Sequence, residues 1–113
     1  MFSSYMRIVV LNGFPLNAIG KRQFTANVRE TSLHELAKMI PDGTEVIHYI
    51  RHASTLEVLR KYIPLLPESP NSGLYKWQEG DVIVSITLRN PPRGAADVAV
   101  TENDILVHIV TIS

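Results

Sequence analysis

The sequence has no cysteine, no net charge and no long apolar run, and each absence excludes a class of protein. Without cysteine, neither a disulfide framework nor a thiolate metal site can form. Eleven basic and eleven acidic residues cancel, which argues against a protein that coats long nucleic acid through a broad basic face. No apolar run reaches membrane-span length, and residues 1–7 lack the order of a signal peptide. We therefore expect a soluble, cytoplasmic protein with no membrane partner.

The hydrophobic pattern predicts a single α/β domain over residues 1–113, with a mixed β-sheet flanked by helices. Apolar residues make up 45% of the chain, which supports a globular core. Runs of strand length occur in four segments, at 7–11, 23–28, 46–50 and 104–112. Two further runs, 74–77 and 81–88, flank a Gln-Glu-Gly turn and predict a β-hairpin.

Helical signals lie between these strands. The expected helices are a short helical turn within 14–20, a helix opened by Ser32 with Glu35 and closing before Pro41, and a helix from Ser54 to Pro64. The proline-rich segment 64–73 should be a loop, with Leu65 and Leu66 tucked against the body. Residues 95–103 remain open between a loop and a brief helix capped by Thr101 and Asp104.

His52 lies where the hydrophobic period changes from that of a strand to that of a helix. Residues 46–50 are β-prone, whereas apolar residues recur at helical spacing over 56–63. Ser54 and Glu57 form a capping-box pattern at the start of this helix. The first-turn N–H groups of a helix attract anions. The sequence therefore predicts a phosphate site beside an imidazole that can donate a proton.

The alternative for His52 is an exposed loop histidine without a role. His48 lies inside an apolar strand and is predicted to be a core or cross-strand residue, while His34 and His108 are expected to be structural or surface groups. No histidine pair has the helical spacing of a zinc motif with a third ligand nearby, so we predict no metal.

Polar residues follow three of the predicted strands, and ligands in open α/β sheets gather at the carboxyl ends of strands. The residues at these ends are Asn12, Gly13, Arg51, His52, Arg89 and Asn90. Guanidinium groups make forked contacts to phosphate oxygens. Together, Arg51, Arg89 and Arg93 predict an anion site, provided that the fold brings them together.

Four segments of the chain resemble, in matching order, the viral anti-CRISPR ring nucleases and their archaeal and bacterial relatives. They are Leu-Asn-Gly-Phe-Pro-Leu-Asn-Ala-Ile at 11–19, Ile-Arg-His-Ala-Ser-Thr-Leu at 50–56, Gln-Glu-Gly-Asp at 78–81, and Leu-Arg-Asn-Pro-Pro-Arg-Gly at 88–94. The most specific piece is His-Ala-Ser-Thr at 52–55, which is similar to the family's Gly-His-Asp/Glu-Ser-Thr signature.

The resemblance implies a homodimer of α/β subunits that binds cyclic tetra-adenylate, the second messenger of type III CRISPR defence, in a cleft at the two-fold axis. Such enzymes need no metal or other cofactor. A ribose 2′-hydroxyl attacks the adjacent phosphate, which yields linear di-adenylate ending in a 2′,3′-cyclic phosphate. By match, His52 is the general acid, Ser54 and Thr55 hold phosphates, and Asn12 and Gly13 belong to a ligand-binding loop.

The chain departs from the family pattern near the predicted site. Arg51 replaces the glycine that precedes the family histidine, where it adds a phosphate contact or crowds the ring. Asn90 and Arg93 stand where relatives carry an arginine and an assisting glutamate, with Arg89 one position early. We predict Arg89 as catalytic and Asn90, Arg93 and Arg51 as ligand-binding, and the contact to the scissile phosphate stays open between Arg89 and Arg93.

Two alternatives to an enzyme follow from these features. The replaced glutamate favours a non-catalytic module that sequesters a cyclic oligoadenylate. A DNA-binding dimer is the third possibility, against which the neutral net charge counts. The preferred ring size, and a viral or a cellular origin, stay open at this stage; in the viral case the protein would act in the cytoplasm of the host cell.

Overall fold

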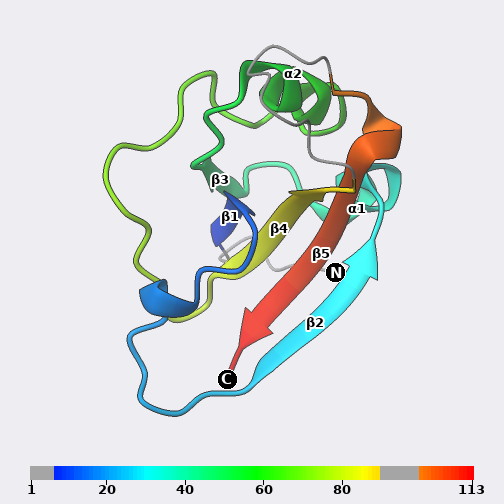
Figure 1. The fold of residues 1–113 in the computed structure, drawn as a ribbon. Helices are drawn as coiled ribbons and strands as arrows, with labels where there is room; N and C mark the ends of the chain where they lie inside the picture. The colour runs from blue at the N-terminus through cyan, green and yellow to red at the C-terminus, as the bar shows by residue number, and fades with distance from the viewer. Residues whose placement is uncertain (1–6, 90–99) are drawn as a thin grey trace.

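The protein is described here by a computed structural model that covers residues 7–89 and 100–113. Its elements, in chain order (Figure 1), are β1 (Arg7–Asn12), η1 (Leu16–Ala18), β2 (Ala26–Thr31), α1 (Leu33–Met39), β3 (Glu45–His48), α2 (Ala53–Tyr62), β4 (Val82–Leu88), η2 (Glu102–Asp104) and β5 (Ile105–Ile112). The strands form one five-stranded sheet in the order β2-β5-β4-β1-β3. The predicted α/β class with a mixed sheet is confirmed.

Parallel pairing brings the carboxyl ends of three strands to the same end of the sheet. β1 pairs in parallel with both β3 and β4, whereas β5 runs antiparallel to β4 and to β2. The carboxyl ends of β1, β3 and β4 therefore lie together, and β5 begins at the same side. We call the residues at and directly after these three ends, residues 12–13, 49–52 and 89, the carboxyl rim.

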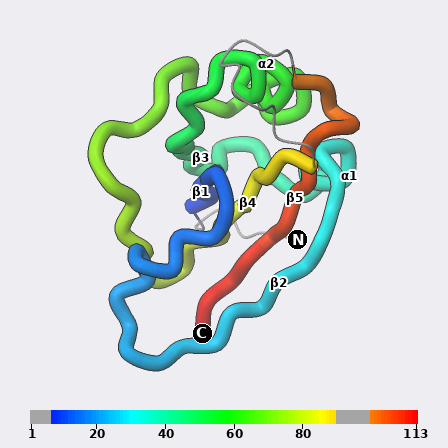
Figure 2. Tube along the Cα trace, viewed as in Figure 1, coloured from blue at the N-terminus to red at the C-terminus, as the bar shows by residue number. Residues whose placement is uncertain are grey.

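Alternating side chains of β1 divide the core into two layers. Ile8 and Val10 pack with α1 and α2 on one face of the sheet. Val9 and Leu11 face the other way and pack with residues that include Ile19 and Tyr75. Both α-helices therefore cover the same face, where Leu66 joins them, while η1 and the later part of the long segment 64–80, with Tyr75 and Trp77, cover the opposite one. Figure 2 shows this segment running from the end of α2 to the neighbourhood of η1.

The predicted hairpin from 74–77 and 81–88 is wrong. Residues 74–77 form no strand, and the chain from 64 to 80 is a loop. The reason lies in β4, whose two sides are already occupied by β1 and β5. The loop instead attaches to the body through side chains and through the backbone N–H of Trp77, which donates to the carbonyl of Ala18 at 2.9 Å. Leu66 is buried as predicted, whereas Leu65 is half exposed.

Local sequence signals account for several other elements. Ser32 caps α1 as predicted, because its hydroxyl accepts from the Glu35 N–H at 3.1 Å. The predicted edge strand exists as the exposed edge strand β2, although it begins at Ala26 rather than at residue 23. Thr101 and Asp104 cap η2, which confirms the brief-helix alternative for that stretch; residues 95–99 lie outside the described residues. No helix within 7–89 and 100–113 has the length and apolar character to cross a membrane.

Candidate functional site

The imidazole of His52 caps the helix that follows it. The Thr55 N–H donates to His52 Nδ1 at 3.3 Å, and Thr55 Oγ1 lies 3.0 Å from the same nitrogen. Helix α2 therefore begins at Ala53, and the predicted capping box of Ser54 and Glu57 is wrong. An acceptor nitrogen on the residue before Ala53 satisfies the third free N–H of the helix, which leaves no capping position for Ser54.

This cap decides which nitrogen of the neutral ring carries the proton. A nitrogen that accepts a hydrogen bond from a backbone N–H uses its lone pair to do so, so the hydrogen of the neutral His52 ring is on Nε2. Nε2 has no hydrogen-bond partner within 7–89 and 100–113, and the residue is partly exposed. The donor N–H of His52 is thus available to a ligand at the carboxyl rim.

The two hydroxyl groups after His52 are both engaged within the chain. Ser54 Oγ accepts from the Val100 N–H at 2.7 Å, which ties the first turn of α2 to the segment that enters η2. Thr55 is only 3% exposed and its hydroxyl is directed to His52. The structure therefore places Ser54 and Thr55 beside His52, but the Thr55 hydroxyl is already committed to the imidazole.

Asn12 and Arg51 meet at the carboxyl rim because β1 and β3 are parallel neighbours. Both line a cavity of about 280 Å³ whose other lining residues include Tyr49, Leu74 and Tyr75. Both side chains are exposed. The cavity thus combines an amide and a guanidinium with aromatic and aliphatic walls.

Gly13 shapes the turn that follows β1. Its φ of +82° lies in the left-handed region that favours glycine, and its N–H donates to the carbonyl of Ile86 at 3.2 Å. This bond fixes the turn after Asn12 against β4. Gly13 is not among the residues that line the cavity of Asn12 and Arg51, so its contribution there is to the path of the backbone.

An apolar groove adjoins this cavity. It has a volume of about 470 Å³ and is lined by residues that follow β1 and by two residues of the 64–80 loop: Phe14, Pro15, Leu16, Asn17, Ala18, Leu74 and Tyr75. Leu74 is 90% exposed and Leu16 is 61% exposed. Sequence reasoning missed Leu74 and Tyr75 because it assigned them to a hairpin strand, and no local signal placed them beside Asn12.

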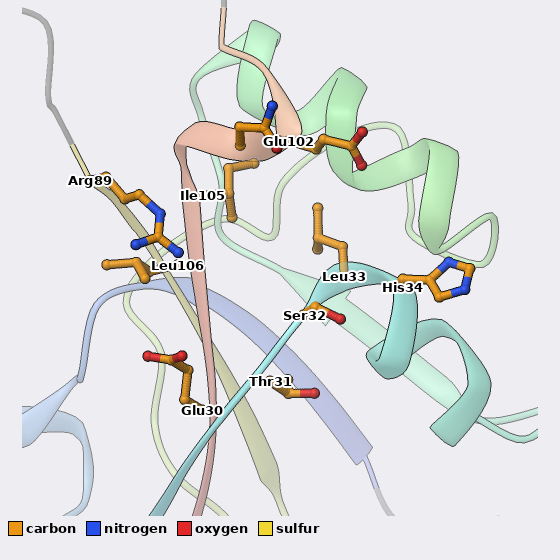
Figure 3. A pocket seen from close by; sticks show the side chains of 10 residues that line it. Glu30, Thr31, Ser32, Leu33, His34, Arg89, Glu102, Ile105 and Leu106 are labelled. Carbon is orange, nitrogen blue, oxygen red and sulfur yellow. The ribbon is translucent and has the colours of Figure 1, made fainter.

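Arg89 lies in a different cavity. Its backbone N–H donates to the carbonyl of Asp104 at 2.8 Å, and its side chain lines a cavity of about 240 Å³ with residues of β2, α1, η2 and β5 (Figure 3). Glu30 and Glu102 line the same cavity, whose lining includes neither His52 nor Arg51. The negative charges of these two carboxylates disfavour the binding of an anionic ligand in this cavity. Asn90 and Arg93 lie outside the described residues.

A buried ion pair fixes the loop that carries Leu74 and Tyr75. Asp81 is 5% exposed and accepts from Arg7 Nε at 2.9 Å, from Arg7 Nη2 at 2.7 Å and from the Tyr75 hydroxyl at 2.6 Å. The hydrogen bonds to Asp81 raise the pKa of Arg7. Burial, followed by the hydrogen bond to Asp81, raises the pKa of Tyr75 far above its usual range. The Tyr75 hydroxyl thus stays neutral at all physiological pH values.

His48 is fully buried, as the sequence predicted for this residue. Its Nε2 lies 2.8 Å from the carbonyl oxygen of Pro67, and its Nδ1 accepts from the Ile50 N–H at 3.2 Å. The ring therefore donates to the loop through Nε2–H and is a structural histidine. Within 7–89 and 100–113, no group of three or more histidine, aspartate or glutamate side chains is arranged to hold a metal ion.

Comparison with known proteins adds a likeness of fold. No protein-family model and no curated protein matches the chain. Among solved structures, the chain is similar to B116 of Sulfolobus turreted icosahedral virus, with a TM-score of 0.68 over 92% of this chain and 97% of that chain. The chain has the fold of B116. The two sequences are 17% identical over this match, so the likeness concerns the fold, and the neighbour is a virus protein.

Proposed function

We propose that the protein is a metal-independent ring nuclease that cleaves cyclic tetra-adenylate and thereby modulates type III CRISPR signalling. The observation that carries the proposal is the capped imidazole of His52, which keeps Nε2–H available at the carboxyl rim. The resemblance of residues 52–55 to the ring nuclease signature supplies the substrate, and the fold shared with a virus protein is consistent with that family.

The reaction is an in-line transfer within the ring. The 2′-oxygen of one ribose forms a bond to the adjacent phosphorus as its hydroxyl proton leaves to water. The bond between phosphorus and the 5′-oxygen breaks, and His52 in its protonated form delivers the Nε2 proton to that oxygen. Two such cuts convert the ring into two linear di-adenylates, each ending in a 2′,3′-cyclic phosphate. The protein contributes orientation and charge to this step.

The cavity of Asn12 and Arg51 supports binding of a nucleotide. A guanidinium pairs with phosphate oxygens, and an amide side chain matches the donor and acceptor groups of adenine. The adjoining apolar groove offers Leu74 and Tyr75 to the faces of bases. We place the ring across this rim in a homodimer, in a cleft at the two-fold axis. Ser54 and Gly13 are proposed to contribute ligand contacts from the α2 turn and the β1 loop.

The arginine of the scissile phosphate is proposed to be Arg89, with Asn90 and Arg93 as ligand contacts on the segment after it. Within one subunit Arg89 lines the cavity that also holds Glu30 and Glu102. Its catalytic role therefore requires that ligand binding draws the side chain out of this acidic surrounding. Measuring Arg89→Ala and Arg93→Ala side by side assigns the role, because only the catalytic arginine should lower the cleavage rate more than it weakens binding.

The proposal is tested by single-turnover cleavage of cyclic tetra-adenylate in the presence of a chelator. His52→Ala should bind the ring but cleave it roughly 100-fold more slowly, which is the usual scale for one general acid. His34→Ala is the control for the loss of an exposed histidine: His34 lines the cavity of Arg89 but not that of Asn12 and Arg51, and its ring points away from Arg89 in Figure 3. Undiminished cleavage by His52→Ala would refute the assignment of His52.

A second candidate function is sequestration of the ring without cleavage. It is favoured by Arg93, which stands where ring nucleases carry an assisting glutamate. In this case the wild-type protein binds cyclic tetra-adenylate tightly and yields no product during a long single-turnover incubation. Arg51→Ala should then weaken binding of the ring. With His52→Ala, as with the wild type, the ring should be recovered intact.

A further inference from the structure

Thr55 presents two groups to the same nitrogen of His52. Its backbone N–H lies 3.3 Å from Nδ1, and its hydroxyl oxygen lies 3.0 Å from Nδ1. The two groups differ chemically, because an amide N–H only donates, whereas a hydroxyl both donates and accepts. In the neutral ring either group can donate to the Nδ1 lone pair.

Protonation of the ring changes which of these two groups can pair with Nδ1. A histidine that acts as general acid carries hydrogen on both nitrogens, so Nδ1 becomes a donor and can no longer accept from the Thr55 N–H. Of the two groups that contact Nδ1, only the hydroxyl of Thr55 can then accept. The hydroxyl therefore keeps the ring paired in the form that the reaction needs.

We propose that Thr55 is a positioning residue for His52, an inference that rests on the proposed function. Its hydroxyl holds the imidazolium so that Nε2 points to the departing 5′-oxygen, and it reverses its role from donor to acceptor when His52 takes up a proton. This differs from the role that the family resemblance implies for Thr55, which is to hold a phosphate. Thr55 is 3% exposed and its hydroxyl already contacts His52, so a phosphate would have to displace that contact.

The position of Thr55 makes it rigid enough for this task. It is the third residue of α2, where the side chain of a β-branched residue has few rotamers. The following turn is anchored by Val58 and Leu59, which are 7% and 0% exposed. The hydroxyl is thus held by a packed helix rather than by a loop.

The test compares Thr55→Val, which is isosteric but lacks the hydroxyl, with Thr55→Ser, which keeps it. Both variants retain the backbone N–H that donates to the His52 cap of α2, and thermal unfolding monitored by circular dichroism verifies their fold. Single-turnover cleavage of cyclic tetra-adenylate should fall about 10-fold or more in Thr55→Val and stay within about 3-fold of wild type in Thr55→Ser. The Kd of the ring, measured with each variant carrying His52→Ala in addition, should change by less than about 3-fold.

The outcomes separate the inference from the proposed function. Wild-type rates in Thr55→Val, or weaker ring binding without a slower step, would overturn the positioning role and leave the proposed function standing. No cleavage by the wild-type protein overturns the proposed function and the role of Thr55 with it. A ¹⁵N NMR measurement on the free protein provides a test without activity: the neutral His52 ring should carry hydrogen on Nε2. Hydrogen on Nδ1 would overturn the reversal, because the Thr55 hydroxyl would then accept from Nδ1 in the neutral and in the protonated ring alike.

Discussion

Replacing Asp81 by asparagine should destabilise the protein more than any other conservative change outside the apolar core. The carboxylate is buried and accepts four hydrogen bonds, two from Arg7 and one each from the Tyr75 hydroxyl and the Gln78 N–H. The Asp81→Asn substitution keeps the size of the side chain. It removes the negative charge and replaces one acceptor oxygen by an NH₂ group that faces other donors.

The expected loss follows from these contacts. Breaking a fully buried ion pair by removing one partner costs about 3–5 kcal/mol, and an exposed pair costs below about 1 kcal/mol. The side chain of Arg7 is 20% exposed and that of Asp81 is 2% exposed, so the pair lies nearer the buried limit. We expect Asp81→Asn to lower the free energy of unfolding by about 3 kcal/mol. Tyr75→Phe removes only one hydrogen bond and should cost about 1 kcal/mol.

Urea unfolding followed by the fluorescence of Trp77 measures both losses, since m-values that agree between variants allow their midpoints to be compared. The double variant Asp81→Asn with Tyr75→Phe should cost less than the two single losses added together, because both remove the same hydrogen bond. If Asp81→Asn costs no more than Tyr75→Phe, the ion pair with Arg7 contributes nothing to the stability of the protein, which would contradict this prediction.

Four further predictions concern stability, binding and cleavage. His48→Ala should lower the free energy of unfolding by about 2–4 kcal/mol, measured by urea unfolding, because it empties a buried site and removes the donor to Pro67. The raised pKa of Tyr75 means that the folded protein keeps this proton while the unfolded chain loses it near pH 10, so the contribution of Tyr75 to stability is constant below about pH 10 and falls above it, which unfolding at several alkaline pH values tests. Arg51→Ala should raise the Kd for cyclic tetra-adenylate about 10-fold in a titration at fixed salt, as expected for one lost charge-assisted contact. Added chelator should leave the cleavage rate unchanged, and a loss of activity on chelation would point to a metal.

Elements encoded by a short stretch of sequence could be predicted, and elements set by distant partners could not. Ser32 and Glu35 define the start of α1 within one turn. The apolar run of β1 likewise identifies a buried strand without knowledge of its neighbours. The segment 74–77 looks like a strand, but both sides of β4 are taken by β1 and β5, a competition that no local window contains.

The candidate site shows the same division. The common rim of Asn12 and Arg51 could be predicted because parallel strands share one end of a sheet. The separate cavity of Arg89 could not, because it depends on β5 and β2 lying beyond β4 in the sheet. The sequence predicts Ser54 as the cap of α2 because serine is a usual capping residue. In the structure the imidazole of His52, one position before the helix, accepts the hydrogen bond from the free N–H instead.

The proposal that this protein is a ring nuclease is tested most directly by incubating the purified wild-type chain with cyclic tri-, tetra- and hexa-adenylate in chelator and resolving the products. If the proposal is correct, cyclic tetra-adenylate is converted to linear di-adenylate ending in a 2′,3′-cyclic phosphate. Recovery of intact cyclic tetra-adenylate after many hours of single-turnover incubation would contradict it.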